Sequence, residues 1–284
     1  MPVAAAVAVL LLVVVASYGQ TVYAYPNGGG AYVVSRENLG EPAALVAASA
    51  LLVDYVMTVA VSVTSGVIAV TSAFPSLVPY AAPIAAVLVV ALALVNLRGV
   101  RESGRAFAVP TYLFIGLTYL LFVVAGVRAA TGTLPPAESA ALPVPPTTAV
   151  GGLLAAALLL RAFASGCTAL TGVEAVSNGV PAFRAPQARN AAMTLVAMGA
   201  IAVTMFAGIT VLAVALSARA APGGNPSVLS QLAASGIGPG SALFYLYQAA
   251  TAGILILAAN TAFNGFPMLT SVLGRDGHLP RQLA

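Results

Sequence analysis

The sequence predicts an all-α membrane protein with about seven transmembrane helices. Of its 284 residues, 60% are hydrophobic and only 6% are charged, whereas an ordinary globular domain carries roughly 25% charged residues. A soluble fold of this length would need far more charge to cover its surface. The apolar residues also gather in stretches close to the roughly 20 residues that a helix needs to cross a bilayer. These observations exclude a soluble enzyme, a disordered chain and a small disulfide-rich module.

Seven apolar segments carry this prediction. Four of them exceed the length that a bilayer requires, so tilted or broken helices are expected among them. Their alanine, valine and leucine residues do not alternate with polar ones, which excludes the strands of a porin-type barrel. The first segment could also be a signal peptide, but it lacks the positive residues that precede one. The segments cover roughly residues 1–17, 42–71, 80–97, 106–127, 149–179, 190–217 and 240–270.

The arginines indicate which way the helices run. When the gaps between segments are numbered alternately, eight of the eleven arginines fall in one set and two in the other. Positive residues gather on the cytosolic side of a membrane, so the N-terminal end is expected outside and the C-terminal end in the cytosol. The set of eight holds Arg36, Arg98, Arg101, Arg105, Arg184, Arg189, Arg275 and Arg281. The set of two holds Arg128 and Arg219, and Arg161 lies inside a segment.

The same composition excludes several other functions. Dispersed arginines do not form the basic stripe that binds nucleic acid. A single cysteine, Cys167, cannot form an intrachain disulfide. The sequence has no Cys/His cluster and no nucleophile–base arrangement, so we expect neither catalysis nor a cofactor. The two exported stretches, residues 129–149 and 218–239, are rich in proline or glycine and are predicted to be irregular loops.

Asp54 is the main candidate for a functional residue. It lies about thirteen residues, or about 20 Å, into the second segment and therefore near the bilayer midplane. Thr58 and Ser62 follow at four and eight residues, which places all three on one face of the helix. A carboxylate followed by hydroxyl groups suits a small cation or a proton. The alternative is that Asp54 is paired with another polar group for packing.

The fifth segment contains a second group of polar residues. Its stretch of residues 165–174, SGCTALTGVE, has two glycines, two threonines and a serine. Such a helix can unwind and offer its carbonyl and hydroxyl oxygens to an ion. Glu174, on the cytosolic side of this break, either carries a proton or is an acid solvated at a helix end. The polar residues of the seventh segment, such as Gln248 and Asn260, fit helix–helix hydrogen bonding at least as well as a substrate site.

Three stretches of the chain resemble transporters of the amino acid–polyamine–organocation (APC) superfamily. Residues 24–32 (AYPNGGGAY), with Asn38 to Gly40, resemble the loop after the second helix of these transporters. Residues 171–175 (TGVEA) resemble the second half of their broken sixth helix, and residues 274–280 (GRDGHLP) the loop after their eighth. The resemblance covers essentially the whole chain. It implies a LeuT-like bundle built on two inverted five-helix repeats, of which this chain would supply helices two to eight.

Within the superfamily, the chain most resembles the potassium–proton symporters of the KUP family. Residues 52–62 (LVDYVMTVAVS) resemble their third helix, in which an Asp, a Thr and a Ser at the same spacing line the potassium path. The resemblance therefore assigns potassium binding to Asp54, Thr58 and Ser62. Residues 165–172 resemble their sixth helix, in which one threonine contacts the ion, and that threonine is either Thr168 or Thr171.

The resemblance implies proton-coupled potassium uptake by a multi-pass protein of the cell membrane, with the proton on Asp54 or Glu174. The alternative is an APC amino acid permease that couples amino acid uptake to protons. A non-transporting membrane scaffold is a third class, which a long soluble domain would support. The expected partners are potassium or another small cation, protons and the lipid bilayer, with a homodimer as one open assembly state.

The chain departs from the family pattern in its length. We expect residues 1–284 to form a single but partial integral membrane domain that lacks the first helix, helices nine to twelve and the nucleotide-sensing domain. The orientation of the arginines leads separately to a missing first helix, because a first segment that enters from outside with no charge before it is an unusual beginning.

Overall fold

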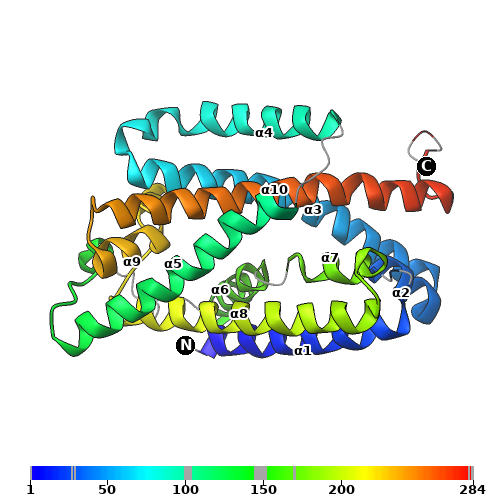
Figure 1. The fold of residues 1–284 in the computed structure, drawn as a ribbon, viewed down its shortest axis with the longest axis horizontal. Helices are drawn as coiled ribbons and strands as arrows, with labels where there is room; N and C mark the ends of the chain where they lie inside the picture. Colours follow the sequence, from blue (N-terminus) through cyan, green and yellow to red (C-terminus); the bar gives the residue numbers. More distant parts are fainter. Residues whose placement is uncertain are drawn as a thin grey trace. The chain divides into compact units, whose positions relative to one another are not determined.

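The computed structural model describes residues 2–26, 28, 30–98, 104–143, 152–168, 171–280 and 282. Within these ranges the chain forms ten α-helices and short 3₁₀ turns, and no strand (Figure 1). The all-α prediction is therefore confirmed. The helices are α1 (Pro2–Ala24), α2 (Ala31–Leu39), α3 (Glu41–Ala73), α4 (Ala81–Leu97), α5 (Gly104–Ala130), α6 (Gly152–Cys167), α7 (Val173–Asn178), α8 (Gln187–Ala215), α9 (Val228–Ile237) and α10 (Ala242–Arg275).

Six helices of the described chain are long and apolar enough to cross a membrane, and they match six of the seven predicted segments. The remaining segment, predicted over residues 149–179, is interrupted as its composition indicated. In that segment α6 ends at Cys167 and the short α7 begins at Val173. Gly172 precedes α7 with a left-handed φ of 97°, a conformation that glycine adopts without strain.

The prediction of an irregular loop over residues 218–239 is wrong in its second half, because α9 forms there. The side chain of Ser227 caps this helix by accepting a hydrogen bond of 3.1 Å from the backbone N–H of Ser230. Leu232 and Ala233 of α9 are fully buried. A good N-cap and an apolar face therefore outweigh the glycine and proline residues that precede the helix.

The described chain divides into two compact units. The first unit comprises residues 1–51 and 143–210, and the second comprises residues 52–142 and 211–284. Because their boundaries fall inside α3 and α8, both helices run without a break from one unit into the other.

The core of the first unit lies between α1, α7 and α8. It is made of small and branched apolar side chains, and Gly199 lets α1 and α8 approach closely, because a methyl group there would lie 2.9 Å from Val15 Cγ1. Figure 1 shows α1 and α8 side by side. The buried members are Leu11, Val15, Val22, Val173, Val180, Ala191 and Leu195.

The second unit is organised around α10, which packs against α4, α5 and α9. Tyr247 of α10 is fully buried, and its ring stacks on Phe114 of α5 with 5.9 Å between the ring centroids. Its hydroxyl group lies 3.3 Å from the hydroxyl of Thr118, within hydrogen-bond distance. A tyrosine buried among apolar helices requires such a partner.

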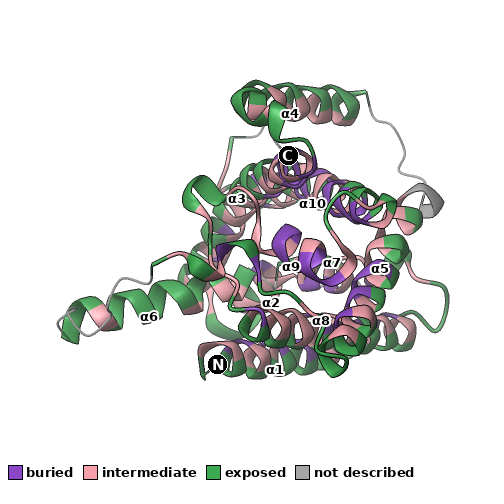
Figure 2. Cartoon of the chain, turned by 90° about the vertical axis from the view of Figure 1, so that its left-hand side faces the viewer, coloured by how far each residue is buried: buried purple, intermediate pink, exposed green. Residues whose placement is uncertain are grey.

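Much apolar surface is exposed, as expected of helices that face lipid. The helices α4 and α6 contain no buried residue in their described parts, and Leu153, Leu160 and Val87 are 88%, 68% and 67% exposed. Figure 2 shows both helices largely in the colour of exposed residues. Water-soluble proteins rarely expose continuous apolar patches of this extent. The protein is thus a multi-pass membrane protein.

Arg128 ties together the stretches that were predicted to lie outside the membrane. Its guanidinium donates hydrogen bonds of 2.9 and 3.0 Å to the carbonyl groups of Ser235 and Gly236, at the end of α9, and one of 3.2 Å to the carbonyl of Thr133. The carbonyls of Ser235 and Gly236 are ones that the end of α9 leaves without an intrahelical partner. Arg128, one of the two arginines that were expected on the outer side of the membrane, therefore has a structural role.

Replacing Arg128 with alanine should destabilise the protein by about 1–3 kcal/mol, because carbonyl groups of α9 lose their donors. Thermal unfolding of the detergent-purified protein measures this change. Arg219→Ala is the control, because the hydrogen bonds found for Arg219 in this region come from its backbone. Equal melting temperatures for the two variants would contradict the role of Arg128.

Candidate functional site

Asp54 lies close to the centre of α3. The helix runs from Glu41 to Ala73, so Asp54 is about 5 Å from its middle along the axis. Asp54 and Thr58 are half-buried, and Ser62 is only 7% exposed. A carboxylate in the middle of a 33-residue apolar helix is costly in lipid and is a candidate functional group for that reason.

The polar side chains of α3 form a line along the helix. At 100° per residue, Thr58 lies about 40° and Ser65 about 20° from the direction of Asp54, and Ser62 lies about 80° from it. The continuous line therefore runs from Asp54 through Thr58 to Ser65, and Ser62 borders it.

The residue next to Asp54 packs closely on α10. A methyl group at Gly265 would lie 2.9 Å from Cε1 and Cζ of the Tyr55 ring, so only glycine leaves room for this ring. Gly66 faces α10 as well, and a methyl group there would make ordinary contacts of 3.6 Å with the Ala252 carbonyl oxygen and the Leu255 Cβ. Close packing on α10 on both sides of this stretch holds the line of polar residues in place.

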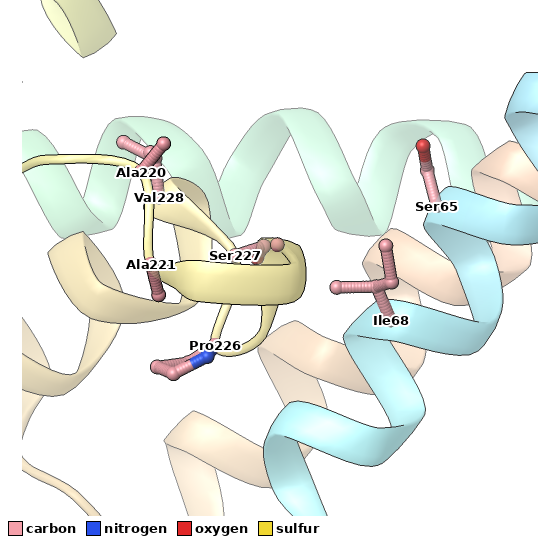
Figure 3. Close-up of a pocket in the computed structure, with 8 residues that line it drawn as sticks. Ser65, Ile68, Ala220, Ala221, Pro226, Ser227 and Val228 are labelled. Carbon is pink, nitrogen blue, oxygen red and sulfur yellow. The ribbon is translucent and has the colours of Figure 1, made fainter. Parts of the chain in front are cut away.

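Ser65 also lines a pocket of about 170 Å³. Figure 3 shows Ser65 and Ile68 on α3, opposite Pro226 and Ser227 at the start of α9. The pocket is thus formed where the polar line of α3 meets the segment of residues 220–228.

Asn225 holds that segment against α3. Its amide donates a hydrogen bond of 2.9 Å to Thr71 Oγ1, and its amide oxygen accepts one of 3.2 Å from Ser72 Oγ. Ser72 Oγ in turn accepts a hydrogen bond of 3.2 Å from the backbone N–H of Ser227. Sequence reasoning missed this network, because nothing local in the sequence links residues 153 positions apart.

The other candidate residues lie in the first unit, at the break between α6 and α7. Thr168 and Thr171 are exposed, and the N–H of Thr171 donates a hydrogen bond of 3.1 Å to the carbonyl of Thr168. Glu174 follows in the first turn of α7 and interacts electrostatically with Tyr18 of α1. Asp54, Thr58 and Ser62 thus lie in the second unit. Thr168, Thr171 and Glu174 lie in the first.

Hydrogen bonding between helices accounts for one polar residue of α10, as proposed from the sequence. Asn96 of α4 donates a hydrogen bond of 2.7 Å to Asn260 Oδ1. Gln248 is 2% exposed, and its Nε2 atom has no hydrogen-bond partner among the described residues. The described residues contain no group of three or more His, Cys, Asp or Glu side chains that could hold a metal ion in such a cluster.

Comparison with known proteins identifies the family. The model of a family described as amino acid permease matches residues 1–284. This chain belongs to that family. The match places the permease in the APC superfamily, which confirms the resemblance seen in three of its loops and helix ends.

A curated relative of this chain is the potassium transporter KimA of Bacillus subtilis (strain 168). The two sequences are 48% identical over 281 residues, which are 99% of this chain and 45% of the relative. The chain therefore spans slightly less than half the length of that relative.

Replacing Asn225 with alanine should loosen the segment that lines the pocket. Loss of its two side-chain hydrogen bonds should cost about 1–2 kcal/mol and speed amide exchange in residues 220–228 by roughly 5–30-fold. Hydrogen–deuterium exchange with mass spectrometry measures this change. Asn96→Ala removes a bond between α4 and α10 instead and should leave these peptides unchanged. Unchanged exchange in Asn225→Ala would show that the network does not hold the segment.

Proposed function

We propose that this chain is part of a transporter that moves potassium into the cell together with protons. The observation that carries the proposal is its 48% identity to a potassium transporter over nearly its whole length. The line of Asp54, Thr58 and Ser65 at the centre of α3 supplies the chemistry that such a function requires.

In this proposal Asp54 and Thr58 bind the cation. Alkali cations are hard and bind oxygen ligands. A carboxylate also balances the positive charge of a cation that has lost its hydration water. Ser62 and Ser65 extend the oxygen-lined face by one to two further turns. The pocket beside Ser65 would be the place at which the ion meets this face from outside.

The broken helix would supply further ligands. Where α6 stops at Cys167, carbonyl groups lose their intrahelical partners and become available to an ion. Either Thr168 or Thr171 adds a hydroxyl group. Glu174 would carry the coupled proton, because a carboxyl group can exchange its charge for a proton as its surroundings alternate between outside and inside.

The driving force would come from the membrane. A potential that is negative inside favours inward movement of a cation by about 2.3 kcal/mol per charge per 100 mV. The proton adds its own gradient when it moves with the ion. We place the C-terminal end in the cytosol on the distribution of the arginines. We also propose that residues 1–284 act as one integral membrane domain, because α3 and α8 each continue from one unit into the other.

A second candidate function is proton-coupled amino acid uptake, which the family description favours. An amino acid carries a carboxylate, which would be repelled by the Asp54 carboxylate in the proposed path. Uptake measured with potassium and with a panel of amino acids separates the two candidates.

Asp54→Asn should lower rubidium uptake by at least about tenfold, because the neutral amide loses the charge balance that binds the cation, and tenfold corresponds to about 1.4 kcal/mol. Uptake is measured in cells without other potassium uptake systems, with the protein expressed at its natural length. Glu138→Gln, a change of an exposed acid, is the control. Undiminished rubidium uptake in Asp54→Asn would refute the assignment.

Single cysteines introduced in a cysteine-free background should report the orientation. Cysteine at Glu138 should react with a membrane-impermeant thiol reagent in intact cells. Cysteine at Glu37 or Arg275 should react only after permeabilisation, because the arginines place both positions in the cytosol. All three positions are exposed. The opposite labelling pattern would show that the expected orientation in the membrane is wrong.

A further inference from the structure

The glycine-rich loop between α1 and α2 lies against the end of α7. This loop resembles no phosphate-binding loop, since no strand precedes it and no lysine follows it. In Figure 1 α7 lies beside the end of α1 that leads into this loop. Within the first unit, Gly28 and Gly30 both face Asn178, the last residue of α7.

Both contacts leave no room for a side chain on the loop. A methyl group at Gly28 would lie 2.9 Å from the Asn178 carbonyl oxygen, and one at Gly30 would overlap the Asn178 side chain, with Cγ at 3.2 Å. Gly28 also has a φ of 90°, which disfavours any other residue. Gly30 has an ordinary φ of −62°, so a methyl group there would act only by displacing the end of the Asn178 side chain.

Side chains of α2 contact the start of this segment. The Asn38 side chain donates a hydrogen bond of 2.8 Å to the hydroxyl of Tyr25, which directly follows α1. Tyr32, in the first turn of α2, is 2% exposed, and the Arg36 guanidinium lies 5.5 Å from the centre of its ring. The described residues on either side of Gly28 and Gly30 are therefore held by α1 and α2, from which these glycines can support α7.

Asn178 is positioned to transmit this support to Glu174. The two residues are four positions apart on a helix of six residues, so they lie on the same face, one turn apart. The opposite end of α7 begins at Gly172, after the break with α6. Tyr18 of α1 interacts electrostatically with Glu174, and Gly28 and Gly30 contact Asn178, so α1 and the residues after it approach both ends of this face.

We propose that Gly28 and Gly30 form a socket for Asn178 and that this socket positions Glu174. By this account α7 moves with α1 and its loop, and the freedom of motion lies at the glycine break before α7. Gly28, Gly30 and Asn178 are positioning residues, and their effect on transport rests on the proton-carrying role proposed for Glu174.

The contact is tested first by stability in the purified protein at its natural length. Gly30→Ala should lower the melting temperature by about 5 °C, because the methyl group overpacks the site. Gly19→Ala, in α1, is the matched control, since no atom lies within 4 Å of the added methyl group. Asn178→Ala in the Gly30→Ala background removes the overlapping amide and should restore most of the loss. Equal losses in the single and double variants would refute the socket, whatever the protein transports.

The positioning role is tested by the pH dependence of rubidium uptake. The elements that neighbour α7 carry titratable or charged side chains at Tyr18 and Tyr23 on α1, Tyr25 after α1 and Arg189 on α8. Of these, Tyr18 packs against the core between α1, α7 and α8. Gly30→Ala should shift the pH profile by about 0.5 unit or more, and Asn178→Ala should return it. Glu174→Gln should abolish the limb of the profile that shifts.

These outcomes separate the two proposals. If Glu174→Gln leaves the pH profile intact, the proton-carrying role of Glu174 is wrong, and the stability result still decides the socket. In the other case the pH profile depends on Glu174, and Gly30→Ala lowers the stability but does not shift that profile. The socket then holds α7 without positioning Glu174, and the positioning role is refuted.

Discussion

Hydrogen bonding without water is the constraint on which this structure depends. In the hydrocarbon region each unpaired backbone group costs several kcal/mol, so the chain crosses it as unbroken helices wherever it can. Where a helix stops, other groups must complete its hydrogen bonds. The Arg128 guanidinium does so at the end of α9, and the Ser227 hydroxyl does so at its start. In the proposed transport site, the carbonyl groups at the end of α6 would bind an ion instead.

The composition and the hydrophobic pattern predicted most of the fold. Long apolar helices can be recognised from the sequence, because the bilayer alone sets their length and their lack of charge. The break after Cys167 was also predictable, because glycine and hydroxyl residues cluster where a helix would otherwise continue. Helix α9 was missed, because its residues are too few to give a strong periodic signal beside Gly223, Gly224 and Pro226.

The candidate site was predictable only in part. Asp54 was found because an acid in an apolar segment is rare, and Thr58 followed from helical spacing. The contacts of Asn225 with Thr71 and Ser72 depend on long-range packing, which spacing along the chain does not reveal. Gly28 and Gly30 stood out in the sequence as part of a glycine run. Their contact with Asn178, about 150 residues away, could not be predicted from it.

Helix α4 is shorter than the hydrocarbon core of a typical bilayer is thick. Its 17 residues give about 26 Å of helix, less than the roughly 30 Å of a typical hydrocarbon core. The neighbouring α10, with 34 residues, measures about 51 Å and can meet any thickness by tilting. A bilayer around α4 has to thin or draw in the preceding 3₁₀ turn of residues 75–80. Acyl chain length is therefore a variable to which this side of the protein responds.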